Sequence, residues 1–242
     1  MTMADDENSP LNRVCFRRTL PDMKWMKKLF GMQVDPKLLP DTAKPPTNPA
    51  FPVEKLIVAA PGRLSCSAHK WHHPLHLDWE FVIGFQPVEF VGETCDTAIC
   101  IEIETTDISR LDQFTGMQRH EADPIGTFGS FYLFDCRTSV DTRFRIHSVQ
   151  GNKLNIEASI LVDIGDSYVD SNPPLRIIKA RSEVVFEGIL VSSRSVECKP
   201  EEEALMKVAN ELFDTSLFAS PKMEWDSYES KQVLNFFFKP LS

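Results

Sequence analysis

The 242-residue sequence lacks several features that would assign it to a broad class of protein. No apolar run approaches the ~20 residues that span a bilayer, so no transmembrane segment is expected. The N-terminus is acidic and has no apolar core of the kind that a secretory signal carries, so a cytoplasmic protein is predicted. The six cysteines are scattered and form no Cys-x-x-Cys pair, which is typical of free thiols in a reducing compartment.

Positive charge is also scarce in this sequence. Lysine and arginine number 26 against 35 aspartate and glutamate residues, so the formal net charge is −9. An acidic surface repels a phosphate backbone, so no nucleic-acid partner is expected. Hydrophobic residues make up 42% and charged residues 25%, which are the proportions of an ordinary globular domain with a substantial core.

Two features set the start of the chain apart from the rest. Residues 13–37 carry seven lysines and arginines against two aspartates, and residues 21–30 have the spacing of a short basic amphipathic helix. Seven of the 17 prolines lie within residues 36–61, where they oppose helix and central strand and predict an extended arm. The predicted organisation is an N-terminal helix and proline-rich arm in residues 1–52, followed by one globular domain in residues 53–242.

Alternating apolar residues predict that the globular domain is rich in β-strand. Residues 78–85 and 99–104 place apolar side chains at every second position, and residues 153–164 do so over almost their whole length. Residues 183–191 are apolar on both faces, which is typical of a central strand. Residues 233–238 predict a final strand near the C-terminus.

The segments on either side of Gly151 and Asn152 are expected to pair as a hairpin. A two-residue turn would place Arg145 opposite the core residue Ala158 and mix charge with the core, because a slip of one residue moves every side chain to the other face. A three-residue loop that starts at Gln150 keeps the apolar positions together, so the pattern favours it. The pairs expected with this loop are Ile146 with Ile156, Phe144 with Ala158, and Arg145 with Glu157.

One long helix is predicted near the C-terminus, over residues 200–214. It starts with proline and has three glutamates in its first turn, where the helix dipole favours anions, and its apolar residues recur at helical spacing. The fold class is therefore α+β and β-rich: a curved antiparallel sheet, a barrel or a sandwich, with this helix packed on it. The N-terminal helix and the proline-rich arm complete the expected architecture.

One stretch of the sequence carries residues that could bind a metal ion. Four of the six histidines fall within eight residues, with a cysteine before them and an aspartate after them. Thiolate, imidazole and carboxylate groups are ligands of zinc and iron, so the candidate metal ligands are Cys66, His69, His72, His73, His76 and Asp78. Pro74 opposes a helix here, so the segment is expected to be extended, with at most three of these groups on one side. The spacing matches no established zinc motif, so this prediction rests on composition.

The sequence leaves three functions open. A non-enzymatic binding or protein-interaction domain is favoured, because no catalytic motif is present. A metal-dependent hydrolase or oxidoreductase that uses the histidine-rich cluster is the first alternative, with a zinc or iron ion as its cofactor. A small-molecule carrier with a cavity inside the curved sheet is the second alternative. The expected partner is accordingly a protein or a small molecule.

Overall fold

The computed structural model describes residues 51–70, 74–90, 92–105, 108–122, 128–133, 135–163, 175–228 and 230–241. These residues belong to the second of two units of the chain, Pro49–Ser242. The expected N-terminal helix and most of the proline-rich arm lie outside the described residues, as do His72 and His73. At the end of the arm, the described chain starts with a single turn of 3-10 helix, η3 (Val53–Lys55).

Most of the described chain is β-strand. The strands are β1 (Gly62–His69), β2 (His76–Gly84), β3 (Val88–Phe90), β4 (Glu93–Cys95), β5 (Thr97–Thr105), β6 (Gln118–Glu121), β7 (Gly129–Leu133), β8 (Asp135–Gln150), β9 (Lys153–Asp163), β10 (Leu175–Ser192), β11 (Lys222–Tyr228) and β12 (Lys231–Phe238). The helical elements after η3 are η4 (Leu111–Phe114), α2 (Glu202–Leu212) and η5 (Thr215–Leu217). The segments predicted as strands overlap β2, β5, β8, β9, β10 and β12, so the β-rich α+β class is confirmed.

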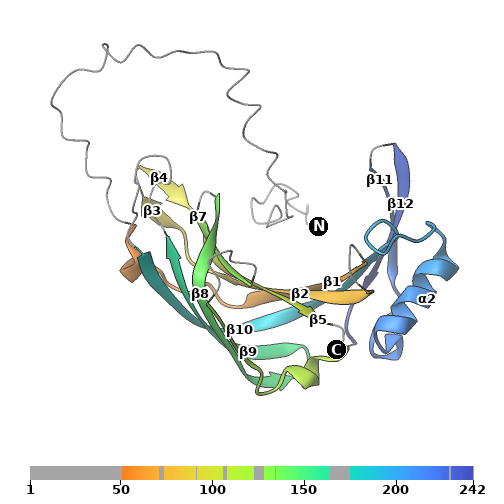
Figure 1. Ribbon diagram of the computed structural model, residues 1–242, viewed down its shortest axis with the longest axis horizontal. Coiled ribbons are helices and arrows are strands. Elements are labelled where there is room, and N and C mark those ends of the chain that lie inside the picture. The colour runs from red at the N-terminus through yellow and green to blue at the C-terminus, as the bar shows by residue number, and fades with distance from the viewer. Residues whose placement is uncertain are drawn as a thin grey trace, which may run out of the picture. The chain divides into compact units, whose positions relative to one another are not determined.

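Ten of the strands form one large curved sheet (Figure 1). Its order is β1-β2-β5-β7-β8-β9-β10-β12-β11, with β6 paired to β8, while β3 and β4 form a separate small sheet. The pairings are antiparallel except that of β1 with β10, so the sheet is mixed as well as predominantly antiparallel. Strand β1 thus pairs with both β2 and β10, and the sheet also continues past β10 into β12 and β11, where β11 is an edge strand.

The apolar side of the curved sheet holds one hydrophobic core. Aromatic side chains from strands that are far apart in the sequence contact one another in this core. The ring centroids of Phe81 on β2 and Phe144 on β8 lie 4.9 Å apart, and those of Trp79 on β2 and Phe186 on β10 lie 5.7 Å apart. Trp79 Nε1 donates a hydrogen bond to Thr105 Oγ1 at 3.2 Å, so the polar group of this buried ring is satisfied. Aromatic rings thus occupy the inside of the curve.

The β8–β9 hairpin has the predicted register but a different turn. The pairs are those expected from the hydrophobic pattern: Ile146 with Ile156, Phe144 with Ala158, and Arg145 with Glu157. The turn itself, however, holds only Gly151 and Asn152, and the φ of 60° at Gly151 fits a glycine at the first central position. A β-bulge between Ile146 and Ser148 takes up the extra residue, His147. The predicted three-residue loop is therefore wrong, because a bulge within the strand restores the register that the loop was expected to supply.

Helix α2 lies within the segment where a C-terminal helix was predicted. Leu205 and Ala209 are completely buried, and Phe213 just beyond the helix is buried with them. Val208 and Leu212 are partly buried against the same core, so residues three and four apart form the packed stripe. Within the part of the chain that the structure describes, no helix has the length and apolar composition that crossing a membrane requires.

Candidate metal site

Three neighbouring strands place the polar residues of the candidate site on one surface. His69, the last residue of β1, pairs with His76, the first residue of β2. Asp78 lies between Ser67 on β1 and Glu104 on β5. Side chains alternate between the two faces of a strand, so these residues share the face opposite the hydrophobic core.

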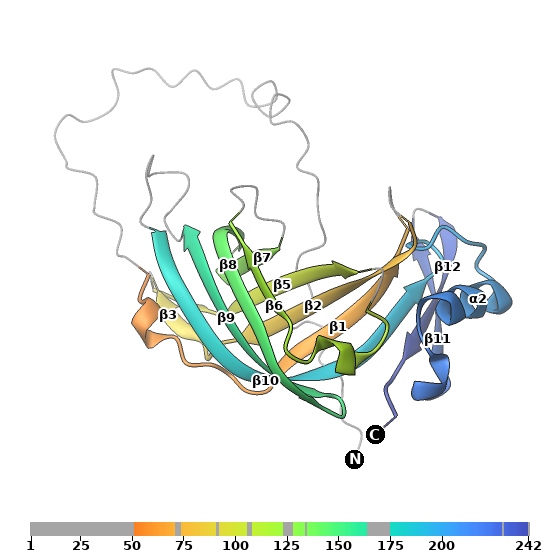
Figure 2. The same cartoon turned by 60° about the horizontal axis from the view of Figure 1, so that its bottom comes forward.

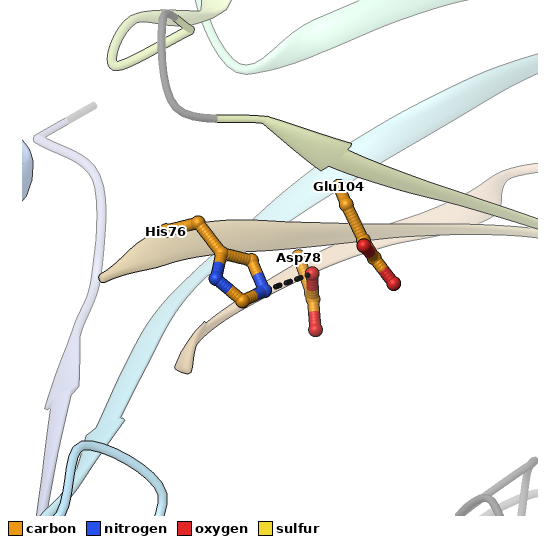
Figure 3. A group of neighbouring side chains, drawn as sticks. All are labelled: His76, Asp78 and Glu104. Carbon is orange, nitrogen blue, oxygen red and sulfur yellow. Dashed lines mark ion pairs between the residues drawn. The ribbon is translucent and has the colours of Figure 1, made fainter. Parts of the chain in front are cut away.

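Asp78 is the centre of this group. Its Oδ1 lies 3.2 Å from His76 Nε2, and its Oδ2 lies 3.7 Å from His69 Nε2. One ligand atom each from His76, Asp78 and Glu104 lie within 4.8 Å of one another. Figure 3 shows His76 and Asp78 projecting from β2, with Glu104 reaching toward them from β5. Nitrogen and oxygen ligands sit about 2.0–2.2 Å from a zinc ion, and three ligand atoms gathered in this way could hold one ion.

A backbone contact of His76 determines which of its ring nitrogens can bind a metal ion. Its Nδ1 lies 2.8 Å from the carbonyl oxygen of Pro74, and because a carbonyl only accepts hydrogen bonds, Nδ1 carries a proton. In the neutral ring Nε2 therefore has the lone pair, and Nε2 is the nitrogen that faces Asp78. A backbone carbonyl on the second ring nitrogen is a common partner of metal-ligating histidines. The His76 side chain is only 8% exposed, so packing also restrains its orientation.

His69 adds a second imidazole beside Asp78. Its Nε2 also lies 2.9 Å from Ser67 Oγ, at hydrogen-bonding distance. Burial lowers the pKa of His69, while Asp78 and Glu104 oppose that shift and His76 adds to it. The lowered pKa favours the neutral ring at pH 7, and the neutral ring is the form that coordinates a metal ion.

Cys66 is separated from this group by the alternation of β1. It lies on the core face, where it is buried among apolar side chains. Burial, followed by the charge of Asp78, raises the pKa of the Cys66 thiol well above its ordinary value, whereas a metal ligand must be a thiolate. His72 and His73 lie outside the described residues. Of the predicted ligands, the structure brings together His69, His76 and Asp78.

Glu104 is a member of the group that the local sequence pattern does not single out. Alternation places Glu104 on the polar face of its strand, where an ordinary solvated surface is the simplest interpretation. The pairing of β2 with β5 sets it beside Asp78, which lies on a different predicted strand. The missing signal is therefore the strand order and register, which two separate alternating segments do not contain.

The polar surface continues along β2 beyond the candidate site. Glu80 pairs with Glu102 on β5 and accepts a hydrogen bond from Ser65 Oγ at 3.3 Å. Burial raises the pKa of Glu80, and the charge of Arg63 partly offsets this shift. Four carboxyl groups thus occupy alternate positions of two paired strands. We call this surface the acidic face: Asp78, Glu80, Glu102 and Glu104.

Comparison with protein-family models, with curated proteins and with solved structures finds no match to this chain. The chemistry of the site therefore follows from its own residues.

Proposed function

We propose that the protein binds a divalent transition-metal ion, zinc or ferrous iron, through His76, Asp78 and Glu104, with His69 as a further nitrogen donor. The hydrogen bond from His76 Nδ1 to the carbonyl of Pro74 carries the proposal. It leaves the metal-binding nitrogen directed at a carboxyl group, with a second carboxyl group within reach. Imidazole and carboxylate together are donors that both ions accept.

The charge of the site also favours a bound cation. Asp78 and Glu104 are direct neighbours across β2 and β5, and two carboxyl groups this close repel each other when both are ionised. A divalent ion between them removes that repulsion and supplies the positive charge that one imidazole cannot provide to both. The Asp78 side chain is 34% exposed, so an ion can reach the site from solvent.

A metal ion bound at this site could also support catalysis. With His76, Asp78 and Glu104 as the ligands, a four-coordinate zinc ion would keep one further position, which His69, water or another ligand could occupy. Such an ion lowers the pKa of bound water to about 7 and polarises a carbonyl or phosphoryl group. A metal-dependent hydrolase or oxidoreductase is the class of enzyme that this arrangement supports.

Metal titration of the full chain tests the proposal. The protein is treated with a chelator and titrated with Zn²⁺, or with Fe²⁺ without oxygen, and bound metal is counted by mass spectrometry. We expect one ion per chain and at least a ~10-fold weaker affinity in His76→Gln and Asp78→Asn. His120→Gln is the matched control. His120 Nε2 lies 2.9 Å from an Asp141 carboxylate, yet the pair belongs to no three-ligand group among the described residues.

Loss of binding in the two site variants but not in His120→Gln supports the proposal. Equal binding by all variants, or no binding by the wild-type chain at micromolar metal, overturns it. Circular dichroism separates loss of metal from loss of fold. The metal-free protein and the site variants are expected to stay folded, because the hydrophobic core lies on the other face of these strands.

A further inference from the structure

A patch of exposed cations lies on the outer surface of β8, β9 and β10, three long strands that run side by side (Figure 2). Strand pairing places two of the cations on the two sides of Ser159 in β9, and the other two on the two sides of Glu157. All four are exposed, although the chain as a whole has a net charge of −9. We call this surface the basic face: Arg143, Arg145, Lys179 and Arg181.

Nearby acidic groups neutralise only a part of this charge. Asp141 is shared, because one carboxylate oxygen lies 2.9 Å from His120 Nε2 and the other lies 3.4 Å from Arg143 Nε. Glu157 pairs with His147 Nε2 at 3.0 Å. The ion pairs of the described chain do not include the other three cations: Arg145, Lys179 and Arg181.

An exposed apolar row continues the basic face along β10. Ile177 and Leu175 occupy the next alternate positions after Arg181 and Lys179, and they are 59% and 49% exposed. Ile177 also pairs with the partly buried Leu161 of β9, so the apolar surface extends onto the neighbouring strand. Contiguous exposed apolar side chains rimmed by polar residues are typical of interaction sites.

We infer that the basic face and this apolar row bind an acidic segment of a partner protein in an extended conformation. Alternate residues of a strand are about 6.6 Å apart. Two carboxylates two residues apart in the partner therefore match Arg181 and Lys179, and an apolar side chain two residues further on matches Ile177. The cations of β8 lie about 10 Å across the sheet from those of β10, where they offer a second row to further acidic side chains. This inference is independent of the proposed metal site.

A nucleic acid fits the same surface less well. Glu157 lies between Arg145 and Arg181, so the cations form two separate rows rather than the continuous positive surface that a phosphate backbone needs. Single strands also bind by stacking bases on aromatic rings. The exposed large aromatic side chains of the described chain, Trp225 and Tyr228, lie on β11 instead.

Peptide binding by the full chain tests this inference. The probe is a fluorescent peptide with the pattern Glu-Ser-Glu-Ser-Leu, followed by fluorescence anisotropy. The test variant combines Arg145→Gln, Lys179→Gln and Arg181→Gln. The matched control combines Lys207→Gln, Lys231→Gln and Lys239→Gln, which removes three exposed lysines from other surfaces and changes the net charge equally. We expect at least a ~10-fold weaker affinity in the test variant, no more than a ~2-fold change in the control, and weaker binding at higher salt.

Ile177→Ser separates the apolar contact from the charge. It is expected to weaken binding of the leucine-containing peptide and to leave binding of a peptide with serine in that place unchanged. Equal binding by the test variant and the wild-type chain overturns the inference, as does equal binding of a peptide with glutamine in place of glutamate. Tighter binding of a single-stranded oligonucleotide of the same charge, or no binding of the peptide by the wild-type chain, overturns it as well.

Discussion

The acidic face on β2 and β5 and the basic face on β8 and β10 lie on the same side of one sheet, yet they carry opposite charge. In both regions, the residues that alternate with these charged side chains point to the other side of the sheet and pack into the same core. Phe81 of β2 contacts Phe144 of β8 there. One set of alternate residues therefore supports the fold in both regions alike. The other set is free to differ, and both the proposed metal site and the basic face lie there.

The two faces also differ in how firmly their side chains are held. Beside the acidic face, His76 is 8% exposed and is oriented by a backbone carbonyl, and the adjacent His69 lies at hydrogen-bonding distance from Ser67. On the basic face, the cations are exposed, and Arg143 has 68% of its side chain in contact with solvent. A small ion needs ligands that are already oriented, whereas long solvated cations suit a partner that brings its own opposite charges.

The largest effect is expected where both faces share the core. Phe144→Ala removes a buried ring that contacts Phe81 and should lower the free energy of unfolding by about 3–5 kcal/mol. Arg143→Ala changes the preceding residue, on the outer side of β8, and should change it by no more than about 0.5 kcal/mol. Urea denaturation measures both values. Similar losses in the two variants would contradict the division between core and outer positions.

A smaller effect separates a specific ligand from general negative charge on the acidic face. Glu104→Gln should weaken zinc binding by about tenfold, because Glu104 belongs to the three-ligand group. Glu102→Gln makes the same change of charge two residues away on the same face of β5, outside that group, and should weaken binding by less than about twofold. Isothermal titration calorimetry of the two variants measures this difference. Equal losses would mean that the acidic face attracts cations without a defined site.

The strands that were predicted and those that were missed differ in what their alternate positions contain. On β9 four of the five buried positions are leucine, isoleucine or valine and the fifth is Ala158, so the alternation is clear in the sequence. On β1 two of the core positions are Cys66 and Ala68, small side chains that give a weak hydrophobic signal. All seven residues of β11 are exposed, so no buried face marks that strand.

For the candidate site too, the local sequence pattern predicts which face of a strand a residue occupies but not which strands are neighbours. Period-two alternation separates Cys66 from His69, because they are three residues apart on one strand, so their opposite faces follow from the sequence once β1 is known to be a strand. The meeting of His69 with His76 needs the β1–β2 pairing, and that of Asp78 with Glu104 needs the β2–β5 pairing. Such contacts depend on the order of strands, which local composition does not encode.

Removal of the bulge on β8, the strand that carries Arg143 and Arg145, should change the stability of the fold by a smaller amount. Deletion of His147 should leave Ile146 opposite Ile156 and join the two paired segments directly, with a loss of stability of about 1 kcal/mol or less. Cross-strand nuclear Overhauser effects measure the register. Deletion of Asn155 from the facing strand is the control. It makes the core residues Leu154 and Ile156 adjacent, so one of them must leave the core, and this variant should lose far more stability.

The smallest effect concerns a carboxylate that borders the basic face. The hydrogen bond from His120 is the main cause that lowers the pKa of Asp141, and the charges of His120 and Arg143 add to it. A carboxyl group whose pKa is lower in the folded state stabilises the fold above its unfolded pKa of about 3.9, and this contribution is lost as the pH falls through the folded value. Asp141→Asn should therefore lower the melting temperature slightly at neutral pH, and the difference from the wild-type chain should disappear in acid. The same substitution removes a negative charge beside Arg143, so it should strengthen binding of the acidic peptide. A difference in melting temperature that persists unchanged below pH 3 would show that Asp141 acts through packing rather than through its charge.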